Sequence, residues 1–125
     1  MGITEGKSAK ASTTVTQSNT AKAVGSGSFD VFSTPMMIAL MEEAACNCII
    51  SFLEEGQSSV GTQISVEHTS ASPIGAEITA TATITSVDGR KIEFEVSAKD
   101  NTKEIGKGTH TRYIIDIQRF MSKIQ

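Results

Sequence analysis

The hydrophobic pattern of this chain changes once, close to Gly56. Before that point, from Met36 to Leu53, apolar residues fall on nearly every side of a helix, and such a helix is expected to be buried. Thr34 fits the N-cap of this helix and Pro35 fits its first position. Gly56 is a stop signal for a helix that ends near residue 54. The pattern therefore predicts one long central helix.

After the helix the hydrophobic period becomes two, which is typical of strands that bury one face. In the next strand every second residue is expected to face the helix; these residues are Val60, Thr62, Ile64, Val66 and His68. Further strands are predicted over residues 76–85, 92–99 and about 104–117. Asp88-Gly89 is a strong hairpin signal between two of them. A first strand is expected within residues 11–24.

This order of elements is a strand, a long helix and then four strands in a meander. A single helix covered by one curled sheet satisfies it. We therefore predict an α+β hotdog fold, in which a curved antiparallel sheet of about five strands wraps a long central helix. Residues 1–10 are expected to form a flexible tail, and residues 11–125 a single domain.

Composition narrows the class of protein. The chain has 125 residues and a formal net charge of -3, which argues against nucleic acid as a general partner. Charged residues interrupt the apolar helix and the N-terminus lacks a signal-peptide core, so no membrane partner and a cytoplasmic location are expected. Cys46 and Cys48 lie two residues apart on one helix, which suits neither a disulfide nor a metal motif. No metal site is expected.

A histidine and a carboxylate are predicted to face each other. Alternation puts His68 on the inner face of its strand, and the helix that this face covers carries Glu42. Such a pair is suited to acid–base chemistry. The alternative is a hydrogen-bonded core histidine beside a structural glutamate.

Thr34 has two interpretations. Its hydroxyl can cap the helix, or it can act as a nucleophile if a base lies nearby. Glu42 is eight residues further along the same helix, about 12 Å along the axis at about 1.5 Å per residue. If the two side chains act together, either a second subunit or an extended substrate must join them, which predicts a homodimer.

Arg112 and His110 share one face of the last strand. The guanidinium could bind a phosphate, or it could be a solvated strand residue. No nucleotide-binding loop, nucleophile elbow or zinc signature is present.

Three stretches resemble the hotdog-fold acyl-CoA thioesterases, specifically the fluoroacetyl-CoA thioesterase-like family. They are FSTPMMIALMEEAA from residue 32, VGTQISVEHTSASPIG from residue 60 and EIGKGTHTR from residue 104. The resemblance implies a catalytic triad and a set of substrate contacts. Its catalytic residues fall on Thr34, Glu42 and His68, and its substrate-binding residues on Gly61, Arg112 and Phe32. Gly61 would help to position the thioester carbonyl through its backbone, and Arg112 would contact CoA.

The segment before the helix departs from the family pattern. Fluoroacetyl-specific members carry a phenylalanine-rich lid there, whereas this chain has Gly25 and Ser28 at the lid positions, with Phe29 adjacent. A short-chain or small aryl acyl group is therefore the safer expectation for the substrate.

The resemblance implies a thioester hydrolase that converts an acyl-CoA to free acid and CoA, works as a homodimer or a tetramer, and needs no cofactor. Two alternatives remain open. One is a non-catalytic acyl-CoA or small-ligand binding protein, and the other is a hotdog hydratase or dehydratase.

Overall fold

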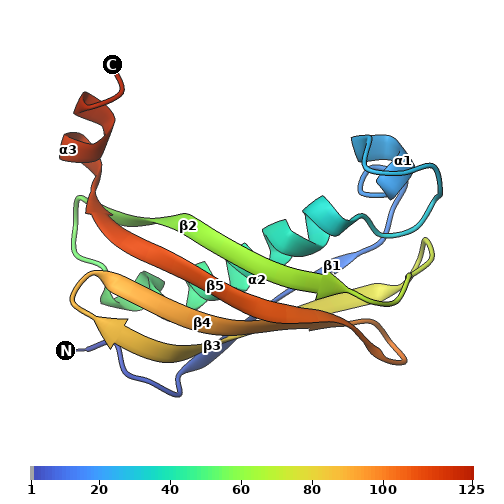
Figure 1. The fold of residues 1–125 in the computed structure, drawn as a ribbon, viewed down its shortest axis with the longest axis horizontal. Coiled ribbons are helices and arrows are strands. Elements are labelled where there is room, and N and C mark those ends of the chain that lie inside the picture. Colours follow the sequence, from blue (N-terminus) through green and yellow to red (C-terminus); the bar gives the residue numbers. More distant parts are fainter. Residues whose placement is uncertain (1) are drawn as a thin grey trace.

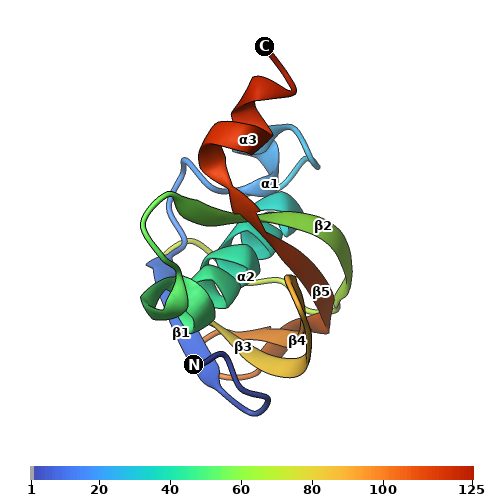
Figure 2. The same ribbon diagram turned by 90° about the vertical axis from the view of Figure 1, so that its left-hand side faces the viewer.

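The computed structural model describes residues 2–125 and contains one curled sheet that wraps one long helix (Figures 1 and 2). The sheet is antiparallel and has the strand order β1-β3-β4-β5-β2. Its strands are β1 (Ser8–Thr14), β2 (Gln57–His68), β3 (Glu77–Asp88), β4 (Lys91–Lys99) and β5 (Glu104–Asp116). The helices are α1 (Ala21–Val24), α2 (Thr34–Ile49) and α3 (Ile117–Ser122). The predicted α+β hotdog fold is confirmed.

The central helix begins one residue earlier than the pattern predicts. Ser33, not Thr34, is the N-cap, because its side chain accepts a hydrogen bond from the backbone N–H of Met36. Thr34 is the first helical residue, so its hydroxyl is not needed for the cap. The helix ends at Ile49 and is followed by a 3-10 turn over Ile50–Phe52, several residues before the predicted end.

The core lies between α2 and the inner faces of β3 and β4. Alternate residues of these strands point inward, as predicted, and are buried; they are Ile78, Ala80, Ala82, Ile84, Ile92, Phe94, Val96 and Ala98. One side of α2 packs on them through Met37, Met41, Ala44, Ala45 and Cys48. The opposite side is not covered within this chain, and Met36 at its start is exposed.

A β-bulge changes which residues of β2 face the helix. Gly61 pairs with Arg112 of β5, and Gln63 pairs with the next residue back, so Thr62 is the extra residue. A one-residue shift reverses the facing of every side chain beyond it. Ile64 and His68 keep the predicted inner face. On the other side of the bulge it is Gly61 and not Thr62 that faces inward, next to Glu42.

Both ends of the chain differ from expectation. Strand β1 starts at Ser8 and pairs with β3, so residues 8–10 belong to the sheet and not to the predicted tail. It stops at Thr14, and Ala21–Val24, expected at the end of a strand, is the short helix α1. Helix α3 after β5 had no counterpart in the sequence analysis and projects from one end of the molecule (Figure 1).

The segment Thr34–Phe52 has 19 residues and a mean hydropathy of 1.3, enough by length and composition to cross a membrane. Its place inside the curl of the sheet gives another reason for that apolarity, since a helix that packs on a core needs the same side chains.

Candidate active site

Thr34 and His68 meet where helix α2 begins. Thr34 Oγ1 lies 2.8 Å from Nδ1 of His68, which is the last residue of β2. A hydroxyl within this distance of an imidazole nitrogen is the arrangement by which a histidine takes the proton of a nucleophile. The two residues also line a cavity of about 250 Å³, whose walls include Phe32 and the small side chains of Ala21 and Ser26.

Burial of the His68 ring favours its neutral form. Burial lowers its pKa from the ordinary value of 6.5, and the backbone near Ser70 opposes that shift only in part. If Nδ1 accepts the proton of Thr34, Nε2 must carry the ring hydrogen. Nε2 is buried, and none of residues 2–125 gives it a hydrogen-bond partner.

Backbone hydrogen bonds from neighbouring loops position the start of α2. The N–H of Phe32 donates to the carbonyl of Ser72 at 2.9 Å, and the N–H of Ser33 donates to the carbonyl of Asn19 at 3.1 Å. Ser72 is itself buried and donates through its hydroxyl to Asp100 at 2.8 Å. The approach of Thr34 to His68 is thus fixed by contacts between segments far apart in the sequence.

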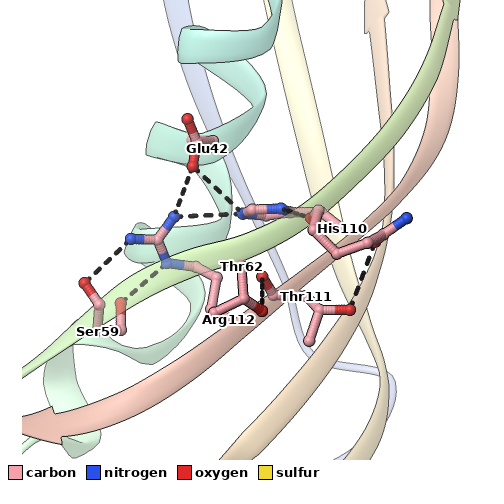
Figure 3. A network of polar contacts seen from close by, with 7 residues as sticks. Glu42, Ser59, Thr62, His110, Thr111 and Arg112 are labelled. Carbon is pink, nitrogen blue, oxygen red and sulfur yellow. Dashed lines mark hydrogen bonds and ion pairs between the residues drawn. The ribbon is translucent and has the colours of Figure 1, made fainter.

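A second polar cluster surrounds Glu42, two helical turns further along α2 (Figure 3). Arg112 Nη1 donates to Glu42 Oε2 at 3.1 Å and lies 3.2 Å from His110 Nε2. The same guanidinium donates through Nε to Ser59 Oγ at 2.9 Å and through Nη2 to the Ser59 carbonyl at 3.1 Å. Arg112 is buried, so it is not the solvated strand residue considered above. The CoA contact that the resemblance implies for it stays a prediction.

Gly61 lies where the side chains of this cluster converge. A Cβ atom added there would collide with Glu42 Oε2 and would come within 3.0 Å of His110 Cε1 and 3.2 Å of Arg112 Nη1. Only glycine leaves room for the carboxylate, the imidazole and the guanidinium to converge. The structure supports a steric reason for a glycine at residue 61, and the carbonyl-positioning role stays a prediction.

The structure brings the predicted site residues together in two groups and not in one. Thr34, His68 and Phe32 lie at the helix start, whereas Glu42, Arg112 and Gly61 lie near its middle. Among residues 2–125 no ion pair joins Glu42 to His68; the histidine nearest the carboxylate is His110, at 3.8 Å. The expected contact between Glu42 and His68 is therefore absent within the described chain. His68 contacts Thr34 at the start of α2, and Glu42 lies two helical turns further along the same helix.

His110 and Ser59 belong to the Glu42 cluster, although the sequence analysis did not select them. The signal for His110 was available, because it alternates with Arg112 on one face of β5. Ser59 was not predictable from the pattern, since the bulge at Thr62 is what turns it toward the guanidinium.

Two other features of the molecule, an outer cleft and a pair of thiols, lie outside this site. A cleft of about 650 Å³ lies over the outer face of the sheet, lined by residues such as Thr83, Glu95 and Lys107, and neither Thr34 nor His68 borders it. Cys46 and Cys48 are free thiols, and burial raises the pKa of Cys48, which makes it a poor nucleophile. Within the described residues 2–125, no three His, Cys, Asp or Glu side chains are grouped to hold a metal ion.

Comparison with known proteins gives one consistent family. A family model described as fluoroacetyl-CoA-specific thioesterase matches residues 15–118. The fluoroacetyl-CoA thioesterase of Streptantibioticus cattleyicolor is 44% identical over 96 residues, which cover 77% of this chain and 69% of that relative.

Solved structures agree with this match. The fluoroacetyl-CoA thioesterase FlK superimposes with a TM-score of 0.92 at 37% identity, covering 99% of this chain and 96% of FlK. A variant of FlK in complex with fluoroacetate and CoA gives 0.89 at 35% identity, covering 94% and 99%. A Thermus thermophilus member of the thioesterase superfamily gives 0.90 at 25% identity, covering 98% and 91%.

Proposed function

This chain belongs to the fluoroacetyl-CoA-specific thioesterase family and is an acyl-CoA thioester hydrolase, and from that premise we propose that Thr34, His68 and Glu42 are its catalytic residues. The observation that carries the proposal is the hydrogen bond of 2.8 Å between Thr34 Oγ1 and His68 Nδ1. It places a hydroxyl and a neutral base in contact at the edge of a cavity.

In the proposed reaction the thioester carbonyl lies in the cavity beside Thr34. His68 accepts a proton from the attacking oxygen through Nδ1 and later gives it to the departing CoA thiolate. The attacking oxygen belongs either to Thr34, which forms an ester that water then hydrolyses, or to a water that Thr34 and Glu42 orient. Both routes consume one water and release one acid and one CoA thiol. The dipole of α2, whose N-terminal end lies at Thr34, favours the negative charge that develops on the carbonyl oxygen.

The proposed active site is completed by a second subunit. Glu42 and Thr34 are about 12 Å apart along the helix axis at about 1.5 Å per residue, so one chain alone does not bring them together. Strand β2 is an edge of the sheet, and edge strands readily pair with another chain. Antiparallel pairing of β2 with its copy puts the Gln57 end of one strand beside the His68 end of the other. This brings Glu42 of the partner subunit toward Thr34 and His68.

The uncovered side of α2 also supports a dimer. Met36, in the first turn of the helix, is exposed, and Ile50, the first residue after the helix, is 64% exposed. Burial of such side chains stabilises association by roughly 25 cal/mol per Å² of apolar area. A homodimer is therefore proposed, and the further step to a tetramer stays open.

The proposed substrate is a short-chain or small aryl acyl-CoA. The cavity beside Thr34 is about 250 Å³ and is bounded by the small side chains of Ala21 and Ser26. The lid positions carry Gly25 and Ser28, and the adjacent Phe29 is 74% exposed, turned to solvent instead of closing the cavity. An aromatic gate that would select a fluorinated acyl group is thus missing from these positions.

A panel of acyl-CoA esters tests the function. Acetyl-, propionyl-, benzoyl- and fluoroacetyl-CoA are incubated with the protein while free thiol and enoyl absorbance are recorded together. We expect thiol release with the small acyl groups and no strong preference for fluoroacetyl-CoA over acetyl-CoA. A change in enoyl absorbance without thiol release on a crotonyl-CoA control would instead support a hydratase, and no change in either signal would support a binding protein.

A further inference from the structure

We propose that His110 is a positioning residue of the active site, which holds Arg112 so that its guanidinium orients the carboxylate of Glu42. This inference rests on the proposed catalytic role of Glu42. It assigns a function to a buried histidine that touches neither the cavity beside Thr34 nor the substrate proposed for it.

Arg112 is almost fully committed to protein acceptors. Four of the five N–H groups of its planar guanidinium have partners: Ser59 Oγ, the Ser59 carbonyl, Glu42 Oε2 and His110 Nε2. The side chain is only 8% exposed, whereas that of Glu42 is 39% exposed. The guanidinium is thus a rigid, buried support, and the carboxylate that it holds is open on its other side.

The hydrogen bonds of His110 determine which ring nitrogen accepts. Nδ1 lies 2.7 Å from the carbonyl oxygen of Gln63, which can only accept, so Nδ1 carries the hydrogen. In the neutral ring Nε2 then has a free lone pair. It lies 3.2 Å from Arg112 Nη1, which can only donate. The two bonds require one tautomer, and both ring nitrogens are satisfied.

The surroundings of His110 keep that tautomer. Its ring is 1% exposed and stacks on Phe94 of β4, with 5.9 Å between ring centroids. Burial lowers the pKa of His110 and the charge of Arg112 lowers it further, while the Gln63 carbonyl and the Glu42 carboxylate oppose these effects without reversing them. A neutral ring is what Arg112 needs, because a protonated Nε2 would point a hydrogen at the guanidinium.

The acceptor at Nε2 settles the orientation of Nη1. This nitrogen has two hydrogens, one for Glu42 and one for His110. Without the second acceptor, a buried N–H of a cation is left unpaired, and the loss of its hydration is then not compensated. The guanidinium would then turn or admit water, and Glu42 would move with it. A displacement near 1 Å at a reacting group can lower a rate by about a hundredfold.

Two substitutions separate this role from simple core packing. In His110→Asn the side-chain amide can still donate to the Gln63 carbonyl, but it is too short to offer an acceptor at the position of Nε2. In His110→Gln the side-chain oxygen can reach that position, while the donor to Gln63 is lost. Thr109→Ala, on the exposed outer face of the same strand, is the control for damage to β5.

The acceptor, and not the ring, should decide the activity. We expect kcat for acyl-CoA hydrolysis to fall by about tenfold to a hundredfold in His110→Asn with KM changed by less than about threefold. His110→Gln should recover kcat to within about fivefold of the parent, and Thr109→Ala should match it. Parental kcat in His110→Asn, or equal losses in the Asn and Gln variants, would overturn the proposal.

A nitrogen NMR measurement tests the same contact without turnover. Hindered rotation of the Arg112 guanidinium should give separate Nη resonances in the parent and in His110→Gln, and averaged ones in His110→Asn. Averaged resonances in the parent would refute the positioning role. If instead the parent shows separate resonances but releases no thiol from any acyl-CoA, the proposed function fails while the contact of His110 with Arg112 stands.

Discussion

Replacing Thr34 and Ser33 by alanine, one at a time, separates catalysis from helix capping. The structure assigns the cap to Ser33, which is buried and accepts from the N–H of Met36. Losing such a cap costs about 0.5–2 kcal/mol of stability. Thr34 is exposed, and its hydroxyl contacts His68 instead of the helix backbone.

The stability cost of Thr34→Ala should therefore be small. The lost hydrogen bond contributes about 0.5–1.5 kcal/mol net. Alanine recovers part of this, because its helix propensity exceeds that of threonine by up to about 0.7 kcal/mol. The net cost should be below about 1 kcal/mol, and Ser33→Ala should melt at the lower temperature of the two.

The activities should rank the other way. A positioned group that takes part in proton transfer or charge stabilisation typically accounts for about a hundredfold or more in rate. We expect Thr34→Ala to lose about that much in kcat/KM and Ser33→Ala to lose only a few-fold. Thr34→Ser should retain part of the rate, because it keeps a hydroxyl but loses the methyl that restricts its rotamer.

The assay is thiol release from acetyl-CoA or another substrate of the panel, beside thermal unfolding of all four proteins. The reasoning is refuted if Thr34→Ala melts below Ser33→Ala and yet turns over substrate at the parental rate. Thr34 would then be a structural residue, and its contact with His68 would have no part in catalysis. Mass spectrometry of the enzyme during turnover tells whether an acyl group is carried on Thr34.

Four further outcomes are expected. Glu42→Gln should abolish turnover with the fold kept, whereas the exposed Glu43→Gln should be mild; the reverse order in thiol release would show that the wrong carboxylate was assigned. Gly61→Ala should lower kcat by about tenfold or more by displacing Glu42, and a parental rate there would contradict the steric argument. Light scattering should give a dimer or larger species at micromolar concentration, and a fully active monomer would exclude the shared site. Because folding lowers the pKa of His68 and His110 below 6.5, the unfolded chain binds more protons, so the free energy of unfolding should fall as pH drops below about 6.5. Denaturant titrations should show a shallower fall in His110→Gln, and an equal slope would argue against a buried neutral ring.

Much of the fold was determined by local pattern. Period-two alternation identified the inward faces of β3 and β4, because a strand with one buried face must alternate. The Asp88-Gly89 signal identified the hairpin between them, although its two loop residues are Gly89 and Arg90. The apolar run after Pro35 identified the central helix. Resemblance of the surrounding motifs selected Thr34, Glu42 and His68, and simple alternation placed His68 on the inner face, where the structure has it.

Tertiary structure decided how these residues are grouped. Contacts between distant loops bring Thr34 to His68. A bulge at Thr62, which no alternation pattern reveals, turns Gly61 toward Glu42 and Ser59 toward Arg112. Residue spacing shows which side chains share a face, but it cannot show which partner each polar atom takes, because that depends on register and on packing between segments. That is why the pairing of Arg112 with Glu42 emerged only from the folded chain.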